Sequence, residues 1–166
     1  MIISNNLVGK LFIPVDWIIR INLAWIKSFD EAFNLINEST QDIYLDYPQW
    51  RTKPPKPTIT LNEAIELSRM PRVKYFAVSN IETVEQIQSI MNRLEDVEFV
   101  PKIETVAGVA GMEDMIKAGI KTFMLDKEDL YTDVKQDSER FNELVEDARS
   151  YGDRARVLEL KGVIFD

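Results

Sequence analysis

The stretch FVPKIETVAGVAGMEDMIKAGIKTFMLDKEDLY (99–131) contains one complete strand–helix–strand pattern. An apolar run ends in Lys102–Ile103–Glu104, a short helical pattern follows, and a second apolar run ends in Lys127–Glu128–Asp129. Parallel strands present side chains to ligands at their C-terminal ends. The spacing therefore predicts an ammonium group and two carboxylates around one pocket, which suits a divalent metal and an anionic substrate.

The same alternation of apolar runs and amphipathic helical patterns extends over most of the chain and is typical of βα units with a parallel sheet. Near-continuous hydrophobicity within a run suits a strand that is covered on both faces. The predicted strands are 17–25, 42–47, 73–79, 98–104, 121–126 and 156–165, with 7–15 as a weaker seventh. Helices are predicted after the capping residues Ser28 and Thr60, and over 82–94, 112–118 (ending at Gly119) and 138–151.

Strands recur roughly every 23 to 35 residues, as in a (β/α)₈ barrel of about 250 residues. Six or seven strands are fewer than a closed barrel needs, whereas an open doubly wound sheet has no such requirement. Periodicity leaves both architectures open. The three prolines of RTKPPKPT (51–58) predict a stiff, extended connector. The length of 166 residues favours one domain over 1–166.

Composition excludes several classes of function. The chain has no His and no Cys, which removes Ser-His-Asp and Cys-His catalysis, disulfides, and metal sites built on imidazole or thiolate. Any metal must take oxygen ligands, which suits Mg²⁺ or Mn²⁺. The net charge of −8 argues against nucleic acid. No apolar run reaches transmembrane length and no clear signal peptide is present, so we expect a cytoplasmic protein without membrane partners.

Several segments resemble, in the same order along the chain, pyruvate kinase and the wider superfamily of phosphoenolpyruvate- and pyruvate-binding barrels. IIRINLAW (18–25) is similar to the strand that carries the family's R-x-N-x-S-H motif, with Arg20 and Asn22 matching. DIYLDYPQWRT (42–52) resembles the LLDxxGPxxRT strand and its turn, with Asp46 matching.

Three later segments continue the resemblance. KYFAVSNIETVEQI (74–87) looks like the family's D-F-[IV]-A-[LV]-S-F-V strand, and its Ser79 matches. KIET (102–105) with Gly108 is close to K-I-E-N-x-x-G-V, and FMLDKEDL (123–130) resembles I-M-V-x-R-G-D-L. Matches on several successive strands make the resemblance more specific than any one motif.

The resemblance implies an α/β fold of TIM-barrel type with six to seven βα units, either incomplete or closed by a partner. It implies that Lys102 is catalytic and stabilises a transferring phosphoryl group or an enolate. Glu104 and Asp129 would bind Mg²⁺ or Mn²⁺, because two adjacent carboxylates need a hard cation to stay ionised together.

The remaining site residues follow from the same resemblance. Arg20 and Ser79 would bind the substrate, and a guanidinium is well suited to phosphate or carboxylate. Asn22 and Asp46 would line a neighbouring K⁺ site or support the residues that touch the ligand. A structural ion pair between Arg20 and Asp46 is the alternative, because a charge within an apolar strand needs a partner.

The predicted function is a pyruvate-kinase-like, metal-dependent enzyme that acts on phosphoenolpyruvate, pyruvate or a related small oxyacid. The alternatives are a metal-dependent aldolase or lyase of the same superfamily and a non-catalytic or regulatory relative. Three departures from the pyruvate-kinase pattern favour a chain that keeps the ligand pocket but not the kinase activity. The nucleotide-capping domain is missing, Glu128 replaces the glycine of R-G-D-L, and Ala24 and Trp25 replace the family's Ser and His.

Two further hypotheses concern charged residues at the edges of these motifs. Asp126 and Glu128 could be extra metal ligands, but we expect solvated charges in a loop that leads to a solvated helix. LKGVIFD (160–166) also resembles the first strand of haloacid-dehalogenase-type phosphatases. On that hypothesis a longer parent continues beyond Asp166, which would be a nucleophile in a missing C-terminal domain. A homo-oligomer that completes the barrel is the other expectation.

Overall fold

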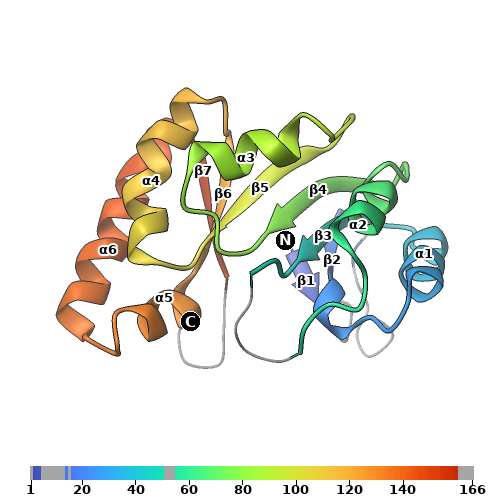
Figure 1. Cartoon of the computed structure of the whole chain (residues 1–166), viewed down its shortest axis with the longest axis horizontal. Helices are drawn as coiled ribbons and strands as arrows, with labels where there is room; N and C mark the ends of the chain where they lie inside the picture. Colours follow the sequence, from blue (N-terminus) through green and yellow to red (C-terminus); the bar gives the residue numbers. More distant parts are fainter. Residues whose placement is uncertain (1, 5–13, 15, 51–54, 161–166) are drawn as a thin grey trace. The chain divides into compact units, whose positions relative to one another are not determined.

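The computed structural model describes residues 2–4, 14, 16–50 and 55–160 (Figure 1). Most of the weak strand predicted at 7–15, the first half of the proline-rich connector, and the C-terminal segment with Asp166 lie outside the described residues. The chain divides into two compact units, Met1–Val78 with Arg93–Phe99 and Ser79–Asn92 with Val100–Asp166. The prediction of a single domain stays a prediction.

The first unit contains parallel strands that pair in chain order. These strands are β1 (Ile2–Ser4), β2 (Ile18–Asn22), β3 (Asp42–Tyr47) and β4 (Val73–Val78). The helices are α1 (Phe29–Glu38) and α2 (Leu61–Ser68). Their apolar faces form a core that includes Ile21, Ile36, Leu45, Leu67 and Phe76. Burial of these aliphatic and aromatic side chains is the main source of stability of such a layer.

Helix starts in the first unit follow the predicted capping residues. The Ser28 hydroxyl accepts a hydrogen bond from the Glu31 N–H at 3.2 Å, which begins α1. Thr60 and Glu63 form a reciprocal capping box at α2. The strand predicted over 17–25 is shorter, because the Asn22 side chain accepts from the Ala24 N–H and starts a 3₁₀ turn, Leu23–Trp25. β1 was not predicted.

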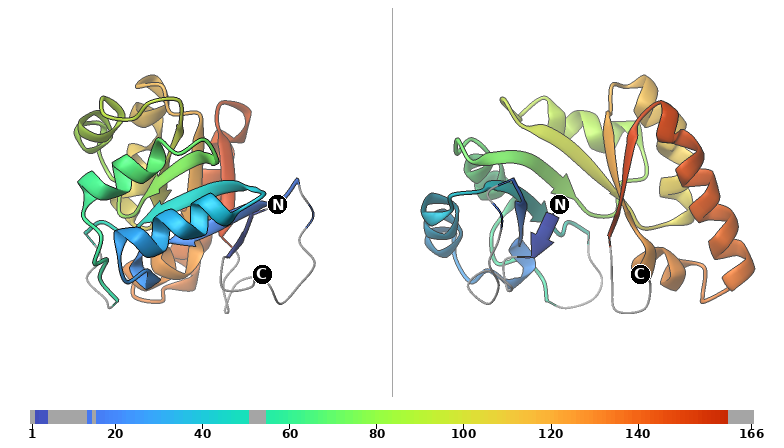
Figure 2. Two further views of the ribbon diagram at one scale, coloured as in Figure 1. Left: turned by 90° about the vertical axis from the view of Figure 1, so that its right-hand side faces the viewer. Right: turned by 180° about the vertical axis from the view of Figure 1, so that it is seen from behind.

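The second unit contains the end of β5 (Glu98–Ile103), followed by β6 (Thr122–Asp126) and β7 (Arg156–Leu160), again parallel and in chain order. Its helices are α3 (Val84–Met91), α4 (Val106–Lys117), α5 (Lys127–Asp133) and α6 (Ser138–Ser150). A 3₁₀ turn, Tyr151–Asp153, follows α6. Helices α4 and α6 lie side by side (Figure 1, Figure 2).

Local signals explain the ends of α4. The helix begins six residues before the predicted start, because the Thr105 side chain accepts from the Gly108 N–H at 3.0 Å and caps it. It ends at Lys117, and the predicted stop Gly119 follows the C-cap Ala118 with a φ of 103°, which is accessible to glycine. The Gly119 and Ile120 N–H groups donate to the carbonyls of Ile116 and Met115, which is a Schellman motif.

Both units alternate parallel strands with helices, and strand order does not reverse within either unit. This confirms the predicted α/β class and is the arrangement of an incomplete TIM-type barrel, since a doubly wound sheet reverses its strand order. Over the residues that the structure describes, no helix combines the length and the hydrophobicity needed to cross a membrane.

Candidate active site at the ends of β5 and β6

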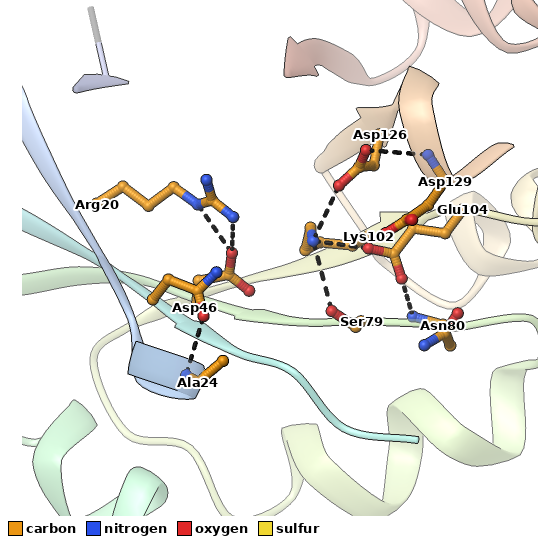
Figure 3. Close-up of polar contacts among 10 residues, drawn as sticks. Arg20, Ala24, Asp46, Ser79, Asn80, Lys102, Glu104, Asp126 and Asp129 are labelled. Carbon is orange, nitrogen blue, oxygen red and sulfur yellow. Dashed lines mark hydrogen bonds and ion pairs between the residues drawn. The ribbon is translucent and has the colours of Figure 1, made fainter. Parts of the chain in front are cut away.

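The ends of β5 and β6 bring charged side chains of the second unit together. In the parallel register Lys102 lies opposite Met124 and Ile103 opposite Leu125. Side chains two residues apart along a strand point to the same side of a sheet. Asp126 lies two residues after Met124 and therefore on the face of the sheet that carries Lys102. Lys102 and Asp126 thus face a common space at the strand ends. Glu104 follows β5 directly and lies in the same space (Figure 3).

The Lys102 ammonium is the centre of this cluster. Its Nζ lies 2.6 Å from Glu104 Oε1, 3.2 Å from Asp126 Oδ2 and 3.4 Å from Ser79 Oγ. Lys102 is only 5% exposed and Glu104 only 3% exposed. Contacts between ionised groups that are shielded from water are stronger than similar contacts on the surface. Lys102 is therefore held in place by acidic partners on two adjacent strands.

Glu104 has a perturbed acidity. Burial raises the pKa of its carboxyl group, and the negative charge of Asp126 raises that pKa further. Lys102 and the Asn80 N–H, which donates to Oε2 at 2.7 Å, act in the opposite direction. The loss of hydration prevails because the carboxyl group is almost fully enclosed. A carboxyl group whose pKa is raised by burial, beside a buried ammonium, is typical of a functional site.

Asp126 and Asp129 complete a group of three carboxylates. The two residues bracket the start of α5, where Asp126 Oδ1 accepts from the Asp129 N–H at 3.4 Å. One carboxylate oxygen from each of Glu104, Asp126 and Asp129 lies within 4.8 Å of the others. Asp126 is buried and Asp129 is half-buried.

The donor set fits a hard divalent cation. Oxygens bound to Mg²⁺ at about 2.1 Å are about 3 Å apart when adjacent and about 4.2 Å apart when opposite, and Ca²⁺ tolerates wider spacings. Shifts of about 1 Å in each oxygen would thus bring the three oxygens onto one ion. Carboxylates are also the ligands that Mg²⁺ and Mn²⁺ prefer to nitrogen or sulfur.

Two glycines of α4 allow this helix to lie close to the loop that contacts Glu104. A Cβ at Gly111 would lie 2.3 Å from the Glu82 carbonyl oxygen, and one at Gly108 would lie 3.0 Å from that of Ile81. The Thr105 hydroxyl donates to Glu82 Oε1 at 2.7 Å. Helix α4 can therefore approach this loop closely, and the loop in turn presents the Asn80 N–H to Glu104. Asn80 has a φ of 54°, a conformation that Asn adopts more readily than most residues.

The structure groups the predicted site residues in two sets. Ser79, Lys102, Glu104 and Asp129 come together in the second unit. Arg20, Asn22 and Asp46 belong to the first unit. There Arg20 Nε and Nη2 donate to Asp46 Oδ2 at 2.8 and 2.5 Å, which is the structural pair considered as the alternative to ligand binding. Asn22 caps the 3₁₀ turn.

One expectation about this site is wrong. Asp126 is not a solvated loop charge, because it is 7% exposed and pairs with Lys102. The loop expected after β6 is likewise the short helix α5, which Asp126 caps. The spacing Asp126-x-x-Asp129 is the sequence signal that could have revealed both features, because Asp is a favoured N-cap residue.

Neither a protein-family model nor a curated protein sequence matches this chain. Solved structures match it in fold. Macrophomate synthase gives a TM-score of 0.65 at 13% identity, covering 87% of this chain and 62% of that chain. RipC from Yersinia pestis gives 0.61 at 16% identity, covering 88% and 71%. An HpcH/HpaI aldolase from Desulfitobacterium hafniense DCB-2 gives 0.57 at 11% identity, covering 87% and 67%.

These similarities concern the fold. Together with the parallel βα order, they show an incomplete α/β fold of TIM-barrel type. At identities of 11–16% the likeness is one of fold alone, and the predicted resemblance to a particular superfamily stays a prediction. None of the three structures named here is a pyruvate kinase. The chain spans less than two thirds of the length of macrophomate synthase.

Proposed function

We propose that this chain supplies the active site of a divalent-metal-dependent aldolase or lyase that forms or breaks a carbon–carbon bond next to a 2-oxo acid. This was the alternative to phosphoryl transfer, and the likeness to an HpcH/HpaI aldolase supports it more than the pyruvate-kinase reading. The observation that carries the proposal is the enclosed group of Lys102 with Glu104, Asp126 and Asp129.

Charge favours carbon–carbon chemistry over phosphoryl transfer. When the three carboxylates are ionised, they exceed Lys102 by two negative charges, which one divalent cation would balance. Sites for phosphoryl transfer need additional cations to neutralise the phosphate oxygens. Lys127, another buried cation of the second unit, forms an ion pair with Glu159 at 3.1 Å. Counted over the described side chains of this cluster, the charge therefore suits a monoanionic 2-oxo acid better than phosphoenolpyruvate.

Each residue has a role in this proposal. A divalent cation held by Glu104 and Asp129 would act as a Lewis acid on the oxygen of the substrate that becomes negatively charged. The Lys102 ammonium would donate a hydrogen bond to the same developing charge, in a site whose burial strengthens the interaction. The Ser79 hydroxyl would orient Lys102. Substrate binding by Arg20 and a K⁺ site at Asn22 and Asp46 stay predictions.

The experiment is a Mn²⁺ titration followed by electron paramagnetic resonance. We expect Glu104→Gln and Asp129→Asn each to weaken Mn²⁺ binding at least about tenfold, as loss of a metal ligand should. Asp114→Asn is the matched control, because Asp114 is an exposed acid on α4 that pairs with Lys117. Unchanged binding in both site variants would contradict the proposed metal site.

A second measurement tests the chemistry. Pyruvate in D₂O should exchange its methyl protons in the presence of the protein and Mn²⁺, because a site that stabilises the enolate accelerates this exchange. Lys102→Met should slow the exchange by about 10² or more. Exchange that is equally fast in this variant would exclude the role of Lys102. Phosphoenolpyruvate with ADP serves as the comparison, and we expect no turnover.

A further inference from the structure

We propose that Asp126 is a third protein ligand of the divalent metal, in addition to Glu104 and Asp129. The inference rests on the proposed function, because the metal is the one that the other two carboxylates would hold. It assigns a direct role to a residue that sequence patterns place in a solvated loop. The geometry that points to it is the mutual distance of 4.8 Å or less among one oxygen from each of the three residues.

The position of Asp126 directs its carboxylate into the cluster. Asp126 is the last residue of β6 and lies two residues beyond Met124, which is the register partner of Lys102 on β5. The period of two along a strand therefore places Asp126 on the face that carries Lys102. Its side chain is largely shielded from solvent, so its charge must be balanced by neighbouring groups rather than by water.

The contacts of Asp126 leave room for a metal. Oδ2 lies 3.2 Å from Lys102 Nζ, and Oδ1 accepts from the Asp129 N–H at 3.4 Å. Both distances are long for hydrogen bonds to an ionised group, which are usually about 2.7–2.9 Å. A carboxylate has about four lone-pair positions, so these two contacts do not exhaust it. Asp126 can therefore bind a cation without giving up the cap of α5.

The third carboxylate also narrows the substrate class. An octahedral ion has about six positions, of which three would be taken by the protein. About three positions would then be left for a small oxyacid substrate such as a 2-oxo acid and for water. Counted over these described groups alone, three ionised carboxylates, Lys102 and a divalent cation would sum to zero charge, which suits such a substrate better than a highly charged phosphate ester.

The test compares Asp126→Asn with Glu128→Gln in the full chain. Asn caps helices as well as Asp does, so Asp126→Asn keeps the shape and the cap but loses the charge and most of the metal affinity of the oxygen. We expect it to weaken Mn²⁺ binding at least about tenfold. Glu128→Gln removes the same charge two residues away, and we expect less than about a threefold effect, because half-exposed charges act weakly.

A second readout does not depend on a variant. Pulsed resonance on Mn²⁺ in H₂¹⁷O counts the water molecules on the ion, and we expect about three in the wild-type chain and about four in Asp126→Asn. About four waters on the wild-type ion, or wild-type affinity in Asp126→Asn, would overturn the assignment of Asp126. If Glu104→Gln and Asp129→Asn also bind Mn²⁺ with wild-type affinity, the proposed metal site is contradicted. If those two variants lose affinity and Asp126→Asn does not, only the role of Asp126 is contradicted.

Discussion

Both compact units bury a contact between a cation and a carboxylate, but the two contacts differ in their balance of charge. In the first unit, one guanidinium meets one carboxylate, and two nitrogens of Arg20 donate to the same oxygen of Asp46. In the second unit, one ammonium meets two carboxylates, and Asp129 adds a third nearby. Chemically similar groups on neighbouring strands therefore produce two different electrostatic situations.

The difference separates a structural ion pair from a cation-binding site. The Arg20–Asp46 contact is neutral as a pair, so an additional divalent cation gains little from it. The Lys102 group carries an excess of negative charge in a shielded place, which is costly unless a cation joins it. A buried ion pair therefore does not by itself indicate function, whereas an excess of one sign in a buried group does.

The largest effect should come from removing each cation. Lys102→Met and Arg20→Met each remove a cation that contacts a buried carboxylate, which costs about 3–5 kcal/mol of unfolding free energy. Saturating Mn²⁺ should restore most of the loss in Lys102→Met, because the metal replaces the missing positive charge, but not in Arg20→Met. Urea denaturation with and without Mn²⁺ measures this. An equal response of both variants to Mn²⁺ would contradict the distinction drawn between the two contacts.

A smaller effect concerns pH in the metal-free protein. Because burial raises the pKa of Glu104 above its ordinary value of 4.5, the folded state holds a proton that the unfolded state has released over that interval. The contribution of Glu104 to stability is therefore largest at low pH and is lost as pH rises through the raised pKa. Glu63 behaves oppositely. Hydrogen bonds from Thr60 lower its pKa, so its contribution exists above 4.5 and is lost as pH falls.

The unfolding free energy as a function of pH tests these two signs. The unfolding free energy of Glu104→Gln should lack the decrease that the wild-type protein shows as the pH rises above about 4.5. The unfolding free energy of Glu63→Gln should lack the increase that the wild-type protein shows as the pH rises toward about 4.5. EDTA in both titrations keeps the site free of metal. If the unfolding free energy of the wild-type protein minus that of Glu104→Gln increases as the pH rises above about 4.5, the pKa shift assigned to Glu104 has the wrong sign.

The smallest effect compares two helix caps. Thr60→Ala and Thr105→Ala should each cost about 1 kcal/mol, the usual loss for a missing N-cap hydroxyl. Only Thr105 also donates to Glu82, in the loop that presents the Asn80 N–H to Glu104. Thr105→Ala should therefore weaken Mn²⁺ binding about threefold, less than for loss of a direct partner of a ligand, whereas Thr60→Ala should leave it unchanged. Equal Mn²⁺ affinity in both variants would show that this loop does not support the site.

The grouping of Lys102 and Glu104 could be predicted from sequence because it follows from two simple rules, whereas Asp129 lies three residues past the end of β6, in the first turn of α5. Parallel strands end at the same edge of a sheet, and residues two apart share a face. The apolar runs at 42–47, 73–79, 98–104 and 121–126 were long enough to identify β3 to β6, and the bounds of β3 agree with the prediction to the residue. A site defined by strand ends is therefore accessible to sequence reasoning.

Asp126 could not be assigned in the same way. A charged residue after an apolar run is usually the first residue of a loop, and its burial here depends on Lys102 from another strand. The short helix α5 has little helical periodicity, with buried Leu130 as its main apolar anchor. The 3₁₀ turn after β2 was missed for a related reason, because buried Leu23 and Ala24 extend the apolar run past the end of the strand.

The cap of α5 gives this protein an internal spectroscopic probe. The Asp129 N–H points at the same carboxylate that faces Lys102. Any change in what Asp126 binds alters the electric field at that amide, and with it the chemical shift of its proton and nitrogen. A diamagnetic ion such as Mg²⁺ can thus be followed at one resolved backbone signal, without a label, while the amides that cap α1 and α2 serve as silent references in the same spectrum.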